Sequence, residues 1–320
     1  MFGSLIQSER PVPAAIRFMR RLYLSGWIPT VLYKKIVTRL CGGSAGIAGD
    51  IRIQTHRGHL VVDSDDEIGR DIYLYFCYDR TVVGYLRHLF GKTPQTTMLD
   101  VGSNIGNHSL WLASCFQRVL SFEPNPAALH YLENNVRIHD NISLYPVSLS
   151  REPGTALLRS GGESNLGQAG IADSPSEDAV EISLESGDGF LRRHGLDEVD
   201  FIKIDVEGHE WEVLGGLRET IRTRMPIILF EYHTDTAEKS GYAIQDFLSG
   251  YDLFGLVGLP KSAQLRAMQE GLVLTPFDAH HQYNNVLGVP CGRRVEIEVD
   301  FPGGVWRQER FFRTPAPGVL

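Results

Sequence analysis

The segment Leu99–Gly106, with the sequence LDVGSNIG, constrains the fold of this chain more than any other feature. Its apolar start is followed by a carboxylate and then by glycines, a pattern typical of a buried strand that turns sharply into a helix. Gly102 and Gly106 permit positive φ and let a ligand approach the backbone without meeting a Cβ atom. The segment therefore predicts an α/β domain with a ligand site at this turn.

A second acidic residue, Glu123, follows 21 residues after Gly102, where a strand over 118–122 is expected to end. An ionised carboxylate accepts from two hydroxyl groups at once, so Glu123 suits the diol of a ribose. Dinucleotide-binding turns carry a glycine at the position of Asn104, which admits the pyrophosphate to the helix N-terminus. Because Asn104 stands there, the turn favours S-adenosylmethionine (SAM), which has no phosphate, over a nicotinamide dinucleotide. Asp100 then serves as an acceptor near the cationic methionine end of SAM.

Further blocks of sequence accompany the glycine turn between about residues 66 and 233. They are DVGSNIG at 100–106, FEPNP at 122–126, NNV at 134–136, IKIDVEGHE at 202–210, VLGG at 213–216, and the segment 226–231. With them the chain resembles the FkbM-type SAM-dependent methyltransferases, and the lysine-to-glutamate block is the most specific part. Two positions depart from the family pattern: Ser183-Leu184-Glu185 replaces a Thr-Leu-Asp, and Tyr78-Asp79 replaces an aromatic residue followed by Glu.

Apolar segments alternate with helical patterns from about residue 96 to 233, which is typical of a doubly wound parallel sheet. Strands are predicted at 97–101, 118–122, 142–147, 199–204, 227–230, 253–257 and 285–289. Helices are predicted at 107–116, after an N-cap at Asn125, at 210–217 and at 243–248. The predicted fold is thus α/β, a class I methyltransferase (Rossmann-like) fold. Its seven-stranded, mostly parallel sheet has helices on both faces, and an N-terminal helical extension precedes it.

The segment between Arg151 and Leu184 does not follow this alternation. Residues 156–158 and 180–182 are predicted to form two antiparallel strands around a loop rich in Gly, Ser and Asp, Ser160 to Asp178. Most loops of this kind are solvated surface, and that is the simpler interpretation. The alternative is a lid over the ligand site, in which Ser164 and Asn165 offer hydrogen bonds.

Charge divides the chain into parts. Residues 1–60 hold nine Lys and Arg and two Asp and Glu, a net charge of +7, so the other 260 residues carry −15 of the total of −8. We predict a basic, helical capping extension over 1–60, a SAM-dependent methyltransferase domain over 61–290 and a C-terminal tail over 291–320 without chemistry. The extension either packs on the domain, the preferred interpretation, or makes peripheral contact with an anionic membrane. The acidic body argues against a nucleic-acid partner.

Composition predicts a cytoplasmic enzyme, with the inner membrane surface as the one site of peripheral attachment. The four cysteines form no C-x-x-C pair, which favours a reducing compartment and argues against a thiolate zinc site. The uncharged apolar stretch Leu22–Tyr33 has 12 residues, too few to span a bilayer. No oligomeric state is predicted.

Site residues are expected at the carboxyl ends of the parallel strands. The predicted SAM-binding residues are Asp100, Gly102, Asn104, Gly106, Glu123 and Ser148, the last near adenine, although a serine in a turn is commonly structural. Methyl transfer to a hydroxyl needs a general base, and the candidates are Asp205, Glu231, His209 and His233. Each histidine has a structural alternative, as has Glu207 at a helix start. A less favoured alternative is that a divalent cation binds to Asp205, Glu231 and His233. No metal ligand is therefore predicted.

The predicted function is SAM-dependent methylation, O-directed, with the resemblance implying a hydroxyl acceptor on a glycan, glycolipid or secondary metabolite. Two rivals stay open. One is a catalytically silent binding protein with the same fold, against which the presence of Asp100, Glu123, Asp205 and Glu231 argues. The other is a nicotinamide-dependent oxidoreductase, which predicts that NAD rather than SAM raises the melting temperature.

Overall fold

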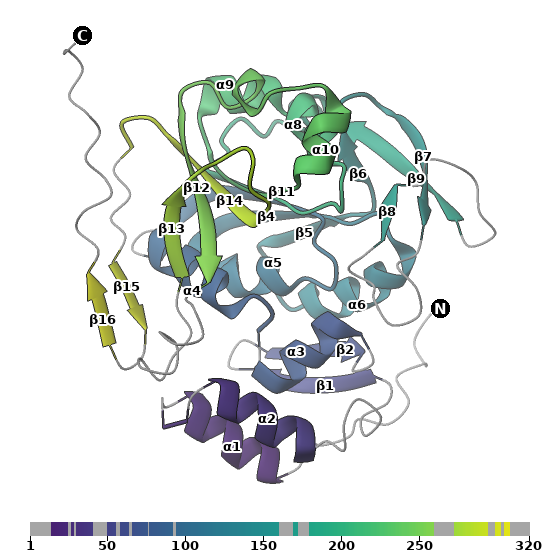
Figure 1. Ribbon diagram of the computed structural model, residues 1–320. Coiled ribbons are helices and arrows are strands. Elements are labelled where there is room, and N and C mark those ends of the chain that lie inside the picture. The colour runs from purple at the N-terminus through teal and green to yellow at the C-terminus, as the bar shows by residue number, and fades with distance from the viewer. Residues whose placement is uncertain are drawn as a thin grey trace.

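The computed structural model describes residues 14–24, 27–28, 30–40, 50–55, 58–63, 66–75, 77–91, 94–159, 169–171, 179–258, 272–293, 298–301 and 304–307. Its main sheet has eight strands in the order β13-β12-β14-β11-β10-β3-β4-β5 (Figure 1). Their bounds, in that order, are Leu272–Pro276, Tyr251–Gly258, Tyr283–Pro290, Ile227–Tyr232, Phe201–Ile204, Gln95–Val101, Phe116–Phe122 and Ile142–Tyr145.

Strand direction identifies the fold. β5, β4, β3, β10 and β11 are parallel, whereas β14 runs antiparallel to β11 and to β12. The chain starts the sheet at β3, builds outward through β4 and β5, and then returns to the other side of β3 with β10, so the strand order reverses there. This arrangement confirms the predicted class I methyltransferase fold, with a mostly parallel sheet and two reversed strands, β14 and β13, toward one edge.

The sheet carries one strand more than the seven predicted. β13 pairs antiparallel with β12 at the sheet edge, and its Leu274 is buried in the same cluster as Leu256 of β12 and Val82 of α4 (Arg80–Phe90). No strand is predicted from the sequence at residues 272–276. The burial of Leu274 against the edge of the sheet explains why the extra strand forms.

Alternate residues of the central strands supply two separate cores. Leu99, Ile202 and Ile228 belong to the core covered by three helices, α7 (Gly187–Arg193), α8 (Glu210–Gly216) and α9 (Arg218–Arg224). Met98, Phe201 and Ile227 point the other way, into the core covered by α4 and α5 (Asn107–Leu112). Because both faces are buried, these strands read as continuous apolar runs rather than as alternating ones.

Several helices and strands begin or end at other residues than predicted. The helix predicted over 107–116 is α5 followed by the 3-10 turn η1 (Ala113–Cys115), so β4 begins two residues before its predicted start. The helix predicted at 243–248 is only the 3-10 turn η3 (Ile244–Asp246), and a separate helix, α10 (Thr234–Ser240), precedes it. Asn125 does cap α6 (Pro126–Val136), since its side chain accepts from Ala127 N at 3.1 Å.

The second sheet has four strands, in the order β6-β9-β7-β8, and stands beside the carboxyl ends of the main strands (Figure 1). β6 is Ser148–Ser150, β7 Gly154–Arg159, β8 Gly170–Ile171 and β9 Ala179–Ser186. The predicted antiparallel pair is β7 with β9. Ser164 and Asn165, which the lid interpretation uses, lie outside the described residues.

The N-terminal part contains two helices and a two-stranded antiparallel β-sheet. α1 (Ala14–Leu24) and α2 (Thr30–Leu40) are the predicted helices, whereas β1 (Asp50–Thr55) and β2 (Gly58–Asp63) form an antiparallel pair across the predicted boundary at residue 60. Together with α3 (Glu67–Tyr75) they pack against α6 (Figure 1). In the predicted tail, β15 (Glu298–Phe301) pairs with β16 (Gly304–Arg307). Among the described residues, no helix has the length and apolar character that crossing a bilayer requires.

Candidate active site

A cavity opens where the carboxyl ends of β3, β4, β10 and β11 meet, as expected for an open α/β sheet. Five of the residues predicted to bind the cofactor or to act in catalysis line it on the sheet side: Gly102, Asn104, Glu123, Asp205 and Glu231. Ser148 and His209 line it as well. The second sheet and the turn after α3 supply the remaining walls, which include Leu158, Ile171, Ile182, Tyr78 and Asp79.

The glycine turn is held by tight backbone packing. Gly102 has φ of +80°, and a Cβ atom there would lie 1.8 Å from the carbonyl oxygen of Asp205, so only glycine fits between β3 and the loop after β10. Gly106 has φ of +91° but does not line the cavity. A Cβ atom at Gly106 would lie 2.8 Å from Leu132 Cδ1, so this glycine allows α6 to approach the turn.

Glu123 links the turn to β4. Its Oε2 accepts from the backbone N of Asn104 and its Oε1 from the backbone N of Asn125, both at 2.8 Å. Burial raises the pKa of the Glu123 carboxyl to about 7, against the opposing effect of these two hydrogen bonds. Because each carboxylate oxygen has two acceptor sites, Glu123 keeps acceptor capacity toward the cavity.

Lys203 is a buried cation between two carboxylates. Its Nζ lies 3.2 Å from Asp205 Oδ2 and 3.7 Å from Asp100 Oδ1. Asp100 is fully buried, accepts from Ser109 Oγ at 2.5 Å and does not line the cavity. Burial raises its pKa, although the Lys203 ammonium opposes that effect. The geometry therefore puts Asp100 beneath the cavity floor, where it acts on the cavity through Lys203.

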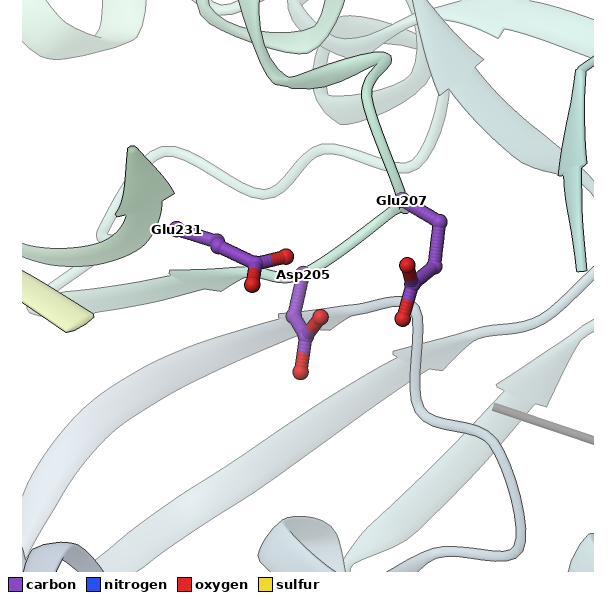
Figure 2. Close-up of side chains that lie close together, drawn as sticks. All are labelled: Asp205, Glu207 and Glu231. Atoms are coloured by element: carbon purple, nitrogen blue, oxygen red, sulfur yellow. The ribbon is translucent and has the colours of Figure 1, made fainter. Parts of the chain in front are cut away.

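Asp205, Glu207 and Glu231 form a cluster of carboxylates in the cavity (Figure 2). Each offers one oxygen atom, and the three atoms lie within 4.8 Å of one another. Asp205 and Glu207 come from the loop after β10, whereas Glu231 comes from β11 with its carboxylate turned toward Asp205 (Figure 2). Oxygen ligands in this number suit a hard divalent cation. His233, named with Asp205 and Glu231 in the sequence analysis, is outside this group, and Glu207 takes its place.

The three carboxyl groups of the cluster differ in acidity. Burial raises the pKa of Glu207 to about 8, helped by the negative charges of Asp205 and Glu231. Burial also raises the pKa of Glu231, with Asp205 adding to the effect. Burial acts in the same direction on Asp205, but the adjacent Lys203 ammonium outweighs it and holds the Asp205 pKa below its usual value. Asp205 is therefore the most acidic carboxyl group of the cluster, whereas both glutamates hold their protons more tightly than free glutamates do.

His233 lies behind Glu231 and not in the cavity wall. Its Nε2 is 2.9 Å from Glu231 Oε1, and its Nδ1 is 2.6 Å from Nε2 of Gln282. An amide N–H of Gln282 donates to Nδ1, which leaves the ring proton on Nε2, directed at Glu231. The second oxygen of Glu231, Oε2, is buried without a hydrogen-bond partner. His233 thus orients Glu231.

His209 and Ser148 have structural partners at the cavity edge. His209 Nε2 lies 3.0 Å from Ser150 Oγ, and burial lowers the pKa of the imidazole. Ser148 is buried, and its Oγ donates to Leu149 O at 3.3 Å. Glu210 stabilises the loop between them and the cluster, because its Oε1 accepts from the backbone N of Val206 and of Gly208.

Sequence reasoning missed His108, Lys203 and Asn285, and it left the role of Asp79 open. His108 is buried in the cavity wall with Nε2 lacking a hydrogen-bond partner, and burial lowers the pKa of the ring to about 3, so the ring is neutral. Asp79 has φ of +51° and accepts from Asn285 Nδ2 at 3.4 Å. Lys203 had a signal, a single cation within an apolar strand, whereas nothing in the sequence marks His108 or Asn285.

The turn that presents Asp79 is fixed by Asn107. Its side-chain amide donates to Tyr78 O at 2.9 Å and accepts from Tyr78 N at 3.1 Å. Asp79 is thereby brought within 3.9 Å of His108 Nε2, although the two residues lie on different elements. The cavity therefore combines Glu123 at one side with several carboxylates and a neutral imidazole at the other.

Comparison with known proteins identifies relatives of this domain. Residues 100–254 match the family model described as the Methyltransferase FkbM domain. The hexuronic acid methyltransferase AglP of Haloferax volcanii is 31% identical over 166 residues, which cover 48% of this chain and 63% of AglP. The 2-O-methyltransferase NoeI of Sinorhizobium fredii is 28% identical over 183 residues, covering 51% of this chain and 74% of NoeI.

Solved structures are also similar to this chain. The crystal structure of a Methyltransferase FkbM from Methylobacillus flagellatus KT superimposes with a TM-score of 0.41 at 20% sequence identity, over 68% of this chain and 52% of that one. The chain thus spans under two thirds of AglP and about half of this structural neighbour.

Proposed function

We propose that the chain, whose residues 100–254 match the model of the Methyltransferase FkbM domain, is a SAM-dependent O-methyltransferase. The observation that carries the proposal is the cavity at the carboxyl ends of the strands, where Glu123 and the carboxylate cluster face the same space. Glu123 can accept hydrogen bonds from the ribose diol of SAM, and the carboxylate cluster can face its cationic methionine end.

The residues of this chain fit SAM in three respects. Glu123 is proposed to accept from the ribose hydroxyls, since its two backbone hydrogen bonds leave acceptor sites open. Asp205 and Asp79 would face the cationic end, and the neutral His108 adds no positive charge there. Asn104 Oδ1 and His108 Nε2 are buried without hydrogen-bond partners, which is costly unless a ligand supplies them.

The adenine is expected near Ser148 and the apolar wall formed by Leu158, Ile171 and Ile182. An aromatic base gains stabilisation from such a wall, because stacking removes its faces from water. Gly106 and Asp100 are proposed to support binding indirectly. Gly106 would do so through the approach of α6, and Asp100 through Lys203.

Bound SAM supplies an activated methyl group on a sulfonium. The protein's own task is to orient an acceptor hydroxyl and to remove its proton. Glu231 is the proposed general base, since burial raises its pKa, which makes it a stronger base, and its Oε2 has no hydrogen-bond partner. His233 would orient Glu231, and Asp205 would stay ionised. His209 is proposed to border the acceptor, with its ring held by Ser150.

The acceptor is proposed to be a hydroxyl on a glycan, glycolipid or secondary metabolite. AglP is a hexuronic acid methyltransferase and NoeI is a 2-O-methyltransferase, which supports a sugar as the acceptor and oxygen as the methylated atom. The acidic body of the chain and its lack of paired cysteine motifs favour a cytoplasmic protein without a nucleic-acid partner.

The test combines cofactor binding with acceptor screening. Titration calorimetry should show binding of SAM and none of NAD, and radiolabelled SAM should transfer its methyl group to at least one glycan in a panel from the host. Running the panel with and without EDTA decides whether the carboxylate cluster acts directly or through a divalent cation. Failure to bind SAM would leave a silent protein of this fold, and binding of NAD would revive the oxidoreductase.

A further inference from the structure

The helices α1 and α2 pack on the domain through one side only. Ile16, Tyr33 and Val37 are buried in a cluster that includes Ile72 of α3 and Leu132 of α6. The two helices therefore pack on the domain through these residues. This packing also fixes which side of each helix faces outward, because residues on the opposite side cannot reach the same core.

The outward side carries large apolar residues in solvent. Trp27, between the two helices, has 75% of its surface exposed, Phe18 has 60% and Leu32 has 45%. Single exposed apolar residues are ordinary, but three on one helical pair, with a tryptophan between the helices, indicate a surface that is used. Arg21, Lys35 and Arg39 are exposed beside them. We call these six residues the hairpin face.

The spacing of the hairpin face matches its exposure. Leu32, Lys35 and Arg39 are three and four residues apart, so they lie along one side of α2, opposite Tyr33 and Val37. Phe18 and Arg21 have the same three-residue spacing on α1. The exposed side of each helix therefore carries both apolar and basic side chains.

Charge identifies the partner. Residues 14–40 contain six Lys and Arg and no Asp or Glu, whereas the chain as a whole carries −8. We propose that the hairpin face docks on the surface of an anionic lipid bilayer, with Trp27, Phe18 and Leu32 entering the headgroup region and the basic residues meeting lipid phosphates. The acidic remainder of the chain is repelled by the same surface, so the protein docks in one orientation.

Docking would bring the cavity close to the membrane. α3 connects the hairpin face to the cavity. Its Ile72 and Tyr73 pack in the cluster under α1 and α2, and its Ile68 lines the cavity. Figure 1 shows α1 and α2 beside α3 at one end of the molecule, away from α9. A consequence that rests on the proposed function is that a lipid-linked acceptor would reach the cavity more readily than a free one.

The experiment is sedimentation of the full chain with vesicles of phosphatidylcholine alone or mixed with phosphatidylglycerol. Binding is expected to the mixed vesicles and to weaken with salt. Lys35→Glu with Arg39→Glu should lower the partition coefficient by about tenfold or more, since each basic residue contributes roughly fivefold at such a surface. Trp27→Ser should also weaken binding.

Matched controls separate docking from general charge and hydrophobicity. Arg218→Glu with Arg222→Glu makes the same charge change on exposed residues of α9, and Ile138→Ser removes an apolar residue that is 52% exposed elsewhere. Both should bind as the unaltered chain does, with melting temperatures confirming folding of every variant.

The proposal fails if the chain does not sediment with mixed vesicles, or if the α9 pair lowers binding as much as the α2 pair. It also fails if Trp27→Ser dissolves a dimer seen without lipid, because the hairpin face would then bind a second copy. Cofactor binding is measured separately, so a failure of the methyltransferase proposal leaves this result standing.

Discussion

Lys203 lies in β10 and Asp205 follows its last residue, with both side chains on the same side of the chain. The Lys203 ammonium lies 3.2 Å from Asp205 Oδ2 in the cavity wall. Residues two apart on a strand share a face, so this ion pair follows from the local sequence once β10 forms. The same ammonium reaches Asp100 on the neighbouring strand, because Lys203 is in register with Asp100. One buried cation thus connects the glycine turn to the carboxylate cluster.

Replacing Lys203 by methionine should destabilise the fold strongly. The change leaves Asp100 buried without its cation, and breaking a buried ion pair costs about 3–5 kcal/mol. Lys203→Met combined with Asp100→Asn removes both charges and should recover much of that loss. Urea unfolding of the two single variants and the double variant measures the coupling, and strictly additive losses would show that the pair does not interact.

Replacing Gly102 by alanine should abolish SAM binding and lower the melting temperature. The added Cβ atom would meet the Asp205 carbonyl at 1.8 Å, and the residue would keep a positive φ that alanine adopts only with strain. Gly154→Ala is the matched control, since nothing lies within 4 Å of a Cβ atom at that position. Normal SAM affinity in Gly102→Ala by calorimetry would mean that the turn is not part of the cofactor site.

The sequence predicted the central part of this fold well because its signals are local. A buried parallel strand ends on a glycine turn at Gly102, and Asn125 with Pro126 marks a helix start, so these elements depend little on distant contacts. The edge strand β13 was missed, since the contacts that stabilise it come from β12 and α4. Short-range pattern cannot supply those contacts.

The sequence predicted most residues of the site but not the hydrogen bonds and ion pairs between them. Carboxyl ends of neighbouring parallel strands meet, which is why Asp205 and Glu231 could be paired from sequence alone. His108 enters the same cavity only because α5 begins beside Asp79, and Asn285 because β14 runs antiparallel next to β11. The direct role predicted for Asp100 did not anticipate its burial, because the sequence does not show that Lys203 covers it.

Glu123 and Glu231 should separate binding from turnover. Glu123→Ala removes the proposed ribose acceptor and is expected to weaken SAM binding by about tenfold or more, at roughly 1.5–3 kcal/mol for a charged hydrogen bond. Glu231→Gln keeps the size of the side chain and should leave SAM affinity unchanged while turnover falls about 100-fold or more. Calorimetry and single-turnover transfer from labelled SAM distinguish these results. Equal losses of SAM affinity in both variants would overturn the division of roles.

Glu207 should make the stability of the chain depend on pH. Its pKa rises from 4.5 to about 8 on folding, so the folded protein holds the proton more tightly than the unfolded one. That contribution to stability is complete below pH 4.5 and is lost as pH rises through about 8. Glu207→Gln should therefore lose less stability than the unaltered chain between these values, in urea unfolding at several pH values. Glu238→Gln, which changes an exposed glutamate of α10, is the control and should follow the unaltered chain.

His233 should set the pH at which Glu231 acts as a base. The hydrogen bond that His233 Nε2 donates favours the ionised form of Glu231 and holds its pKa below the value that burial and Asp205 alone would give. His233→Phe removes this hydrogen bond, so the Glu231 pKa rises and the pH at which turnover is half-maximal should move upward. SAM affinity should stay constant, because His233 does not line the cavity. A uniform fall in turnover at every pH, without movement of the midpoint, would assign His233 a purely structural role.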